Sequence, residues 1–193
     1  MFACRRCRAV VNHGVPTSLG APMNLKKETF RPRQVAEITG WTIQQQADLR
    51  RYSYLETADG WLKADAVLLA RLLLMRALRA LKFELKAAAE IASAEVVNRI
   101  AARAALQPGA IKGVHDRNEL IEAATLLTGS EHWSGDRFLM FDGEMKEARG
   151  ATLDDAWKAF QKQGPSAAVG VVDLDMIAAQ LADRAGVLAR VLD

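Results

Sequence analysis

The chain of 193 residues has only two cysteines, Cys4 and Cys7, both near its N-terminus. Small secreted domains with little core carry several disulfides along their length, so the cysteine content excludes that class. Cys4, Cys7 and His13 could supply three zinc ligands, but the next histidine is His115, too far along the chain for a zinc knuckle. We therefore expect no metal site here, and free thiols in a flexible arm.

Long uncharged apolar runs are also missing. The most hydrophobic window, residues 66–81, is sixteen residues long and contains Arg71, Arg76 and Arg79. A helix needs about 20 apolar residues to cross a bilayer, so no membrane partner is expected. The N-terminus lacks the continuous apolar segment of a secretory signal peptide. These absences, with half of the residues hydrophobic and a quarter charged, favour a soluble cytoplasmic protein.

Signatures of common enzymes are absent as well. The chain contains no G-x-S-x-G, P-loop or Rossmann glycine pattern. Apart from the incomplete set of Cys4, Cys7 and His13, the histidines His115 and His132 have no neighbouring cysteine or carboxylate at metal-ligand spacing. Asp173 and Asp175 could bind a cation, but a strand end followed by a helix start explains them more simply. The sequence therefore predicts a protein that is not an enzyme and needs no cofactor.

Charge is distributed unevenly. Residues 23–110 hold 14 Lys or Arg against 9 Asp or Glu, whereas residues 111–193 hold 9 against 14. The net formal charge of +3 hides this division. A basic segment followed by an acidic one suits a DNA-facing module joined to a module that faces a protein partner or a ligand.

Residues 33–55 read as two short helices joined by a tight turn. Val35, Ala36 and Ile38 lie at helical spacing in a first helix over 34–39. Gly40 can end that helix with a positive φ, and Thr42 is a good N-cap for a second helix rich in Gln and Arg. This order is typical of a helix-turn-helix, whose second helix reads DNA.

The remaining periodicity predicts a mainly α protein with a small α/β part. Asp59-Gly60 marks a turn where a winged helix-turn-helix places its wing. The expected helices are 65–81, 84–106, 116–127, 153–161 and 175–192, and the expected strands are 137–141 and 167–174. The face of the Ala-rich 84–106 helix is the candidate for a homodimer contact, and packing within the chain is the equal alternative.

Residues 30–92 resemble the DNA-binding domain of MerR-type regulators. The similarity rests on Val35–Gly40, on Ala47–Arg51, on Trp61 followed by Ala64–Val67, and on Phe83–Lys86. Gln46 stands where the family usually has an aliphatic core residue. The resemblance implies a winged helix-turn-helix followed by a long helix through which such proteins pair.

On this basis the chain divides into an extension (1–22), a winged helix-turn-helix (23–83), a linking or dimerisation helix (84–109) and a small α/β domain of unknown role (110–193). Gln44, Asp48 and Arg51 share one face of the second helix. The expected contacts with double-stranded DNA come from Thr42, Gln44, Gln45, Arg50, Arg51, Trp61 and Lys63.

The expected function is that of a sequence-specific transcriptional regulator. Two alternatives remain open. The same domain can dock a phage-type structural or adaptor protein on DNA, or it can have lost DNA contact and serve only to bind a protein partner.

Overall fold

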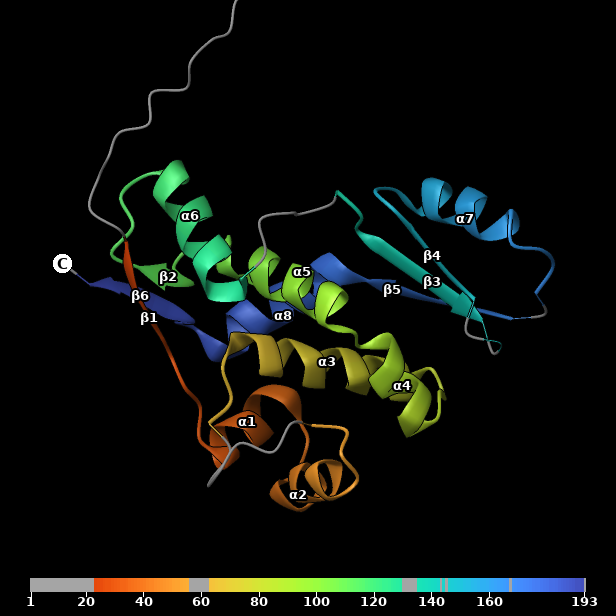
Figure 1. Ribbon diagram of the computed structural model, residues 1–193, viewed down its shortest axis with the longest axis horizontal. Helices are drawn as coiled ribbons and strands as arrows, with labels where there is room; N and C mark the ends of the chain where they lie inside the picture. The colour runs from red at the N-terminus through yellow and green to blue at the C-terminus, as the bar shows by residue number, and fades with distance from the viewer. Residues whose placement is uncertain are drawn as a thin grey trace, which may run out of the picture.

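The computed structural model of the protein describes residues 23–55, 63–129, 135–142, 144, 146–166 and 168–192. Its helices are α1 (Pro32–Thr39), α2 (Ile43–Arg51), α3 (Ala66–Ala80), α4 (Leu85–Ile91), α5 (Ala94–Ala105), α6 (Arg117–Thr128), α7 (Leu153–Gln161) and α8 (Leu174–Ala185). Its strands are β1 (Asn24–Lys27), β2 (Ile111–Lys112), β3 (Phe138–Asp142), β4 (Glu147–Gly150), β5 (Val169–Asp173) and β6 (Ala189–Leu192). The fold is mainly helical, with one small sheet at each end of the helical body (Figure 1).

The two short helices expected over residues 33–55 are present. Pro32 opens α1 two residues earlier than predicted, because a proline at the first helical position loses no hydrogen bond. Gly40 ends the helix with a φ of 74°, and its N–H donates to the carbonyl oxygen of Ala36 at 2.8 Å. Thr42 then caps α2, as predicted.

Helix α3 lies at the centre of the molecule. Asp65 caps it by accepting a 2.9 Å hydrogen bond from the N–H of Leu68. Most of its apolar side chains are buried, and it contacts α1, α4, α5 and α8. The helix predicted over 65–81 is therefore confirmed, and it forms the main wall of the hydrophobic core.

The single Ala-rich helix predicted over 84–106 is wrong. The chain forms α4 and α5, which are separated at Ala92 and Ser93, and Ser93 is the N-cap of α5. The predicted dimerisation face is also used inside the chain, because Ala88, Val96 and Ile100 are fully buried. Helix α5 packs against α3, α6 and α8. The alternative of packing within the chain is therefore correct for this face.

In the second half, the helices near 116–127 and 153–161 and the strands near 137–141 and 167–174 are confirmed. The terminal helix predicted over 175–192 is only partly correct. It ends at Ala185, where Gly186 has a φ of 69°, and Ala189–Leu192 form a strand instead. The short strands β1, β2, β4 and β6 were not expected from the sequence.

The two sheets differ in how far apart in the sequence their paired strands lie. In the first, β6 lies between β1, to which it is antiparallel, and β2, to which it is parallel. In the second, β3 lies between β4 and β5, and both pairings are antiparallel. Side chains on β3 alternate between two cores. Leu139 and Phe141 join the main core, whereas Met140 packs with Phe160 of α7.

The boundaries predicted near residues 83 and 109 do not divide the core of the described chain. Helix α8 packs on both α1 and α3, and the Arg184 guanidinium donates to the carbonyl oxygen of Ile38 at 3.0 Å. Strand β1 pairs with β6, so Asn24 lies opposite Leu192. The segment that forms α1 and α2 is thus built into the same packed body as α8.

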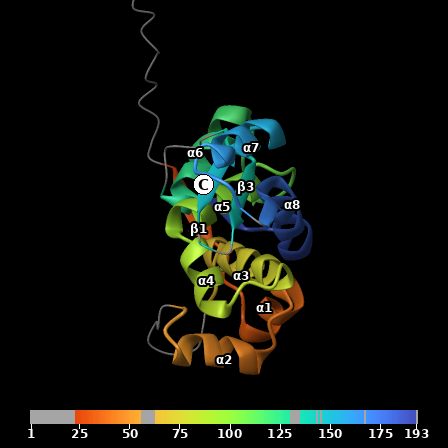
Figure 2. The same cartoon turned by 90° about the vertical axis from the view of Figure 1, so that its right-hand side faces the viewer.

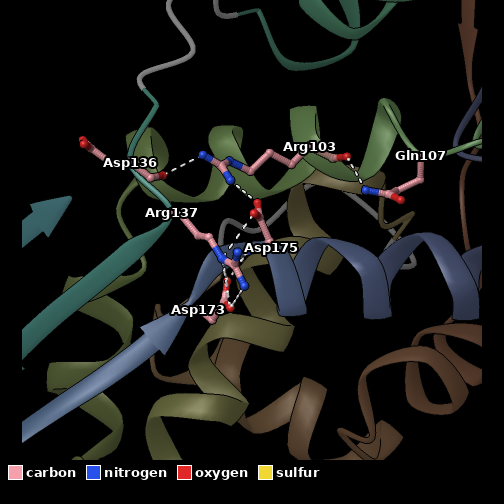
Figure 3. Close-up of polar contacts among 6 residues, drawn as sticks. All are labelled: Arg103, Gln107, Asp136, Arg137, Asp173 and Asp175. Atoms are coloured by element: carbon pink, nitrogen blue, oxygen red, sulfur yellow. Dashed lines mark hydrogen bonds and ion pairs between the residues drawn. The ribbon is translucent and has the colours of Figure 1, made fainter. Parts of the chain in front are cut away.

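A network of ion pairs fastens the second sheet to the helices (Figure 3). Arg103 of α5 pairs with Asp175 of α8 and donates to the main-chain oxygen of Asp136 at 2.7 Å. Arg137 donates to the Asp173 carboxylate at 2.7 Å and lies 3.4 Å from that of Asp175. The hydrogen bond from Arg137 lowers the pKa of Asp173 below its ordinary value.

Candidate nucleic-acid interface

Helix α2 lies along one edge of the molecule, with α1 and α3 on its inner side (Figure 2). Only Gln46 and Leu49 of this helix are buried. Gln44, Ala47 and Arg51 are exposed on its outer side, spaced at helical intervals. The exposed side chains of α2 are mostly polar, although Ile43 at its start and Tyr52 just after its end are also exposed. The polar part of this surface is suited to contact with a hydrated partner such as nucleic acid.

Gln46 connects α2 to the preceding turn. Its side-chain amide donates to the carbonyl oxygens of Pro32 at 3.0 Å and of Trp41 at 2.8 Å. The side chain is fully buried, and its own carbonyl oxygen has no donor among the described residues. An aliphatic residue here would leave both main-chain oxygens without this donor, which explains why this buried position holds a polar residue.

Helix α3 holds the turn between α1 and α2 from the other side. The indole Nε1 of Trp41 donates to the carbonyl oxygen of Leu72 at 2.8 Å. The guanidinium of Arg76, one turn further along α3, donates to the carbonyl oxygen of Gly40. Because both contacts reach the turn, the start of α2 has a fixed position relative to the core.

Several predicted contact residues also build the start of α2. The N–H of Thr42 donates to Gln45 Oε1 at 2.9 Å, and the N–H of Gln45 donates to Thr42 Oγ1 at 3.2 Å. This capping box was not foreseen as the role of Gln45. Gln44 donates to Asp48 Oδ1 at 3.3 Å, one turn along the exposed face. Within the described residues, the side-chain N–H groups of Gln45 and the side-chain carbonyl oxygen of Gln44 have no hydrogen-bond partner.

Of the remaining predicted residues in the described chain, Arg51 lies on this surface, whereas Arg50 and Lys63 are placed elsewhere. Arg51 is exposed and lies 5.9 Å from the ring of Tyr52, whereas the Nε–H of Arg50 turns back to the carbonyl oxygen of Gln46 at 3.4 Å. Lys63 lines a pocket between α3, α5 and α6 instead. Trp61 and the predicted wing turn at 56–60 lie outside the described residues. Beside them, Phe30 pairs with Ala64 in an isolated antiparallel bridge.

Two arginines near α2 were not assigned to the interface from the sequence. Arg76 and Arg79 line a hollow of about 330 Å³ together with Trp41 and Gln45. Both arginines are exposed, and they lie beside the N-terminal end of α2, where the helix dipole also favours an anion. In the sequence, their spacing of three residues places both arginines on the same side of a helix. That spacing alone indicates only a solvent-exposed face and not a site beside α2.

The charge around these helices is strongly basic. Residues 31–55 and 63–82 contain nine Lys or Arg and three Asp or Glu. One of the three acids, Glu37, pairs with Arg33 across one turn of α1 at 3.3 Å. Long-range attraction of a polyanion is a general property of such a surface.

The other candidate sites from the sequence have less structural support. The described residues contain no group of three or more His, Cys, Asp or Glu placed to hold a metal ion. Cys4, Cys7, His13 and His132 lie outside the described part of the chain. Asp173 is the N-cap of α8, where its carboxylate accepts from the N–H of Asp175 at 3.0 Å, as its position at a strand end predicts.

Comparisons with protein-family profiles, with curated proteins and with solved structures gave no match. In the described chain, none of the helices is both long and apolar enough to cross a membrane.

Proposed function

We propose that this protein is a cytoplasmic, sequence-specific DNA-binding regulator with a MerR-like winged helix-turn-helix. The strongest support for the proposal comes from one observation. Helix α2 presents Gln44 and Arg51 to solvent from a turn that Gln46 and Arg76 tie to the neighbouring helices. Such a helix can enter a major groove without reordering its support.

The chemistry of the exposed side chains fits base and phosphate contacts. A glutamine amide can make two hydrogen bonds with adenine, and an arginine can do so with guanine. Arg76 and Arg79 lie beside the start of the same helix, where they suit phosphate contacts that set the position of the helix on the duplex. We propose no dimerisation surface, because the face predicted for it is buried within the chain.

Selection from a pool of random DNA duplexes tests the proposal. The full chain is expected to enrich one short sequence and to bind it more weakly as salt rises from about 50 to about 200 mM, since contacts to phosphates release counterions. The matched comparison uses the double variant Gln44→Ala/Arg51→Ala and the remote surface variant Arg117→Gln on α6. Only the double variant should lose the enriched sequence.

The other outcomes distinguish the alternatives. Salt-dependent binding without any enriched sequence favours a structural or adaptor protein that docks on DNA. No duplex binding at low salt, for the wild type as for the double variant, rejects the proposal and favours a module that binds a protein partner.

A further inference from the structure

A second site lies away from the α2 surface, in a pocket of about 500 Å³ between α3, the start of α5 and the end of α6. This volume is typical of small-molecule sites. Its polar lining includes three cations and one carboxylate: Lys27, Lys63, Arg71 and Asp65. The pocket therefore has an excess of positive charge.

Arg71 is the most informative of these groups. It is partly buried, its Nε–H is fully buried, and its guanidinium has no hydrogen-bond acceptor or ion-pair partner among the described residues. Arg99 and Arg103 of α5 and Arg137 next to β3 all pair with carboxylates. A buried N–H group without an acceptor is costly, and an anionic ligand could accept from the Arg71 guanidinium and remove that cost.

The other charged groups leave room for the same anion. Asp65 is engaged as the N-cap of α3, accepting from the N–H of Leu68 at 2.9 Å. Lys27 donates to the carbonyl oxygen of Leu127, in the last turn of α6, at 2.7 Å, which holds its ammonium at the pocket. Lys63 is exposed and has no ion-pair partner within the described chain.

The rest of the lining is apolar. Val67 and Leu68 of α3, Val97 of α5 and Leu127 of α6 contribute aliphatic side chains. An inorganic anion would leave these groups in contact with water, whereas an apolar ligand would leave Arg71 unpaired. Both parts of the lining are used only by a molecule with an anionic group and an apolar body.

We propose that this pocket binds a small amphipathic carboxylate, with its carboxylate on Arg71 and Lys63 and its aliphatic or aromatic body against Val97 and Leu127. The site does not depend on DNA binding. It does share α3 with the proposed DNA reader, because Arg71 precedes Leu72, whose carbonyl oxygen accepts from Trp41.

Titration calorimetry on the full chain tests the site with 4-phenylbutyrate as the probe. Two matched compounds separate the contributions: 4-phenylbutan-1-ol keeps the apolar body without the charge, and inorganic phosphate keeps the charge without the body. We expect the carboxylate to bind about tenfold or more tightly than either, the factor that one hydrogen bond to a charged group supplies.

Variants then locate the binding. Arg71→Gln should weaken 4-phenylbutyrate binding about tenfold or more, and Lys63→Gln should weaken it by a smaller factor. Arg117→Gln, the same kind of change at an exposed residue at the start of α6, should leave the binding of 4-phenylbutyrate unaltered. If Arg71→Gln does not fold, the exposed Lys63 variant and the three-probe comparison on the wild type still decide the matter.

The proposal is overturned if 4-phenylbutyrate does not bind, if the alcohol or phosphate binds as tightly, or if Arg71→Gln and Lys63→Gln both bind like the wild type. Loss of DNA binding in any of these proteins does not bear on the result, since DNA is absent from the titration.

Discussion

The indole Nε1 of Trp41 donates a 2.8 Å hydrogen bond to the carbonyl oxygen of Leu72. Leu72 is fully buried in the middle of α3, and Trp41 lies in the turn between α1 and α2. The contact therefore joins the turn before the largely exposed helix α2 to the largely buried helix α3. The position of α2 is thus fixed by Trp41, a residue that precedes the helix.

Trp41→Phe should destabilise the fold by about 1 kcal/mol or more, because an aromatic ring remains but the hydrogen-bond donor and part of the indole are lost. Urea unfolding followed by circular dichroism measures this difference. Trp157→Phe is the control, since Trp157 is 42% exposed on α7, and its change should lie within about 0.5 kcal/mol. Equal effects of the two substitutions would contradict the role given to Trp41.

Gln46→Leu should destabilise the fold, although an apolar side chain suits the burial of this position. Leucine removes the donor to the carbonyl oxygens of Pro32 and Trp41, and we expect a loss of about 1–3 kcal/mol in the free energy of unfolding. Gln44→Leu, two residues away on the exposed face, is the matched control and should be nearly neutral. A more stable Gln46→Leu variant would show that the amide is not needed to hold the turn.

Arg51→Ala should reduce the salt dependence of duplex binding. If Arg51 contacts a phosphate, the slope of log K against log salt falls by about 1, with similar losses for all sequences. If it contacts a guanine, the loss of about 1–3 kcal/mol is confined to the selected sequence. Fluorescence anisotropy at several salt concentrations separates these cases, and an unchanged affinity and slope would remove Arg51 from the interface.

Asp173→Asn should make the protein less sensitive to acid. The pKa of Asp173 is lowered in the folded state, so its ion pair stabilises the fold fully above the ordinary aspartate pKa of about 3.9. That contribution is lost as the pH falls through the lower, folded-state pKa. Asparagine can keep the cap on α8, so the change isolates the pair with Arg137.

Urea unfolding at about pH 7 and about pH 3 measures this effect. The wild type should lose more stability than Asp173→Asn between the two values. At neutral pH the variant should be weaker by about 1–2 kcal/mol, a range that allows for the partial exposure of Arg137. Asp154→Asn, in an exposed pair with Lys158, serves as the control and should change little.

Helices with strong end signals were predictable from the sequence. Gly40, Thr42 and Asp65 each stand at the helix end that their chemistry favours. The break at Ser93 was missed because no glycine or proline interrupts the Ala-rich segment. Its one signal was a serine followed two residues later by Glu95, a common helix start.

Features that depend on distant partners could not be predicted in this way. Strand β1 has the sequence NLKK, which is too short and too polar to indicate a strand without knowledge of β6. The burial of Gln46 follows from the position of α1, and the lack of a partner for Arg71 within the described chain follows from its place in a pocket that α3, α5 and α6 line together. The sequence could therefore indicate α2 as the candidate DNA-contacting helix, but not the contacts that hold this helix in place.

The pairing of Asn24 with Leu192 also sets the order in which the chain can fold during synthesis. Strand β1 leaves the ribosome early, but its partner β6 is made only after all eight described helices. Until then β1 has an unpaired edge, and α1 and α3 lack the surface of α8. Contacts between such distant segments slow folding, so the α1–α2 unit should reach its final, fixed form only after translation of this region is complete.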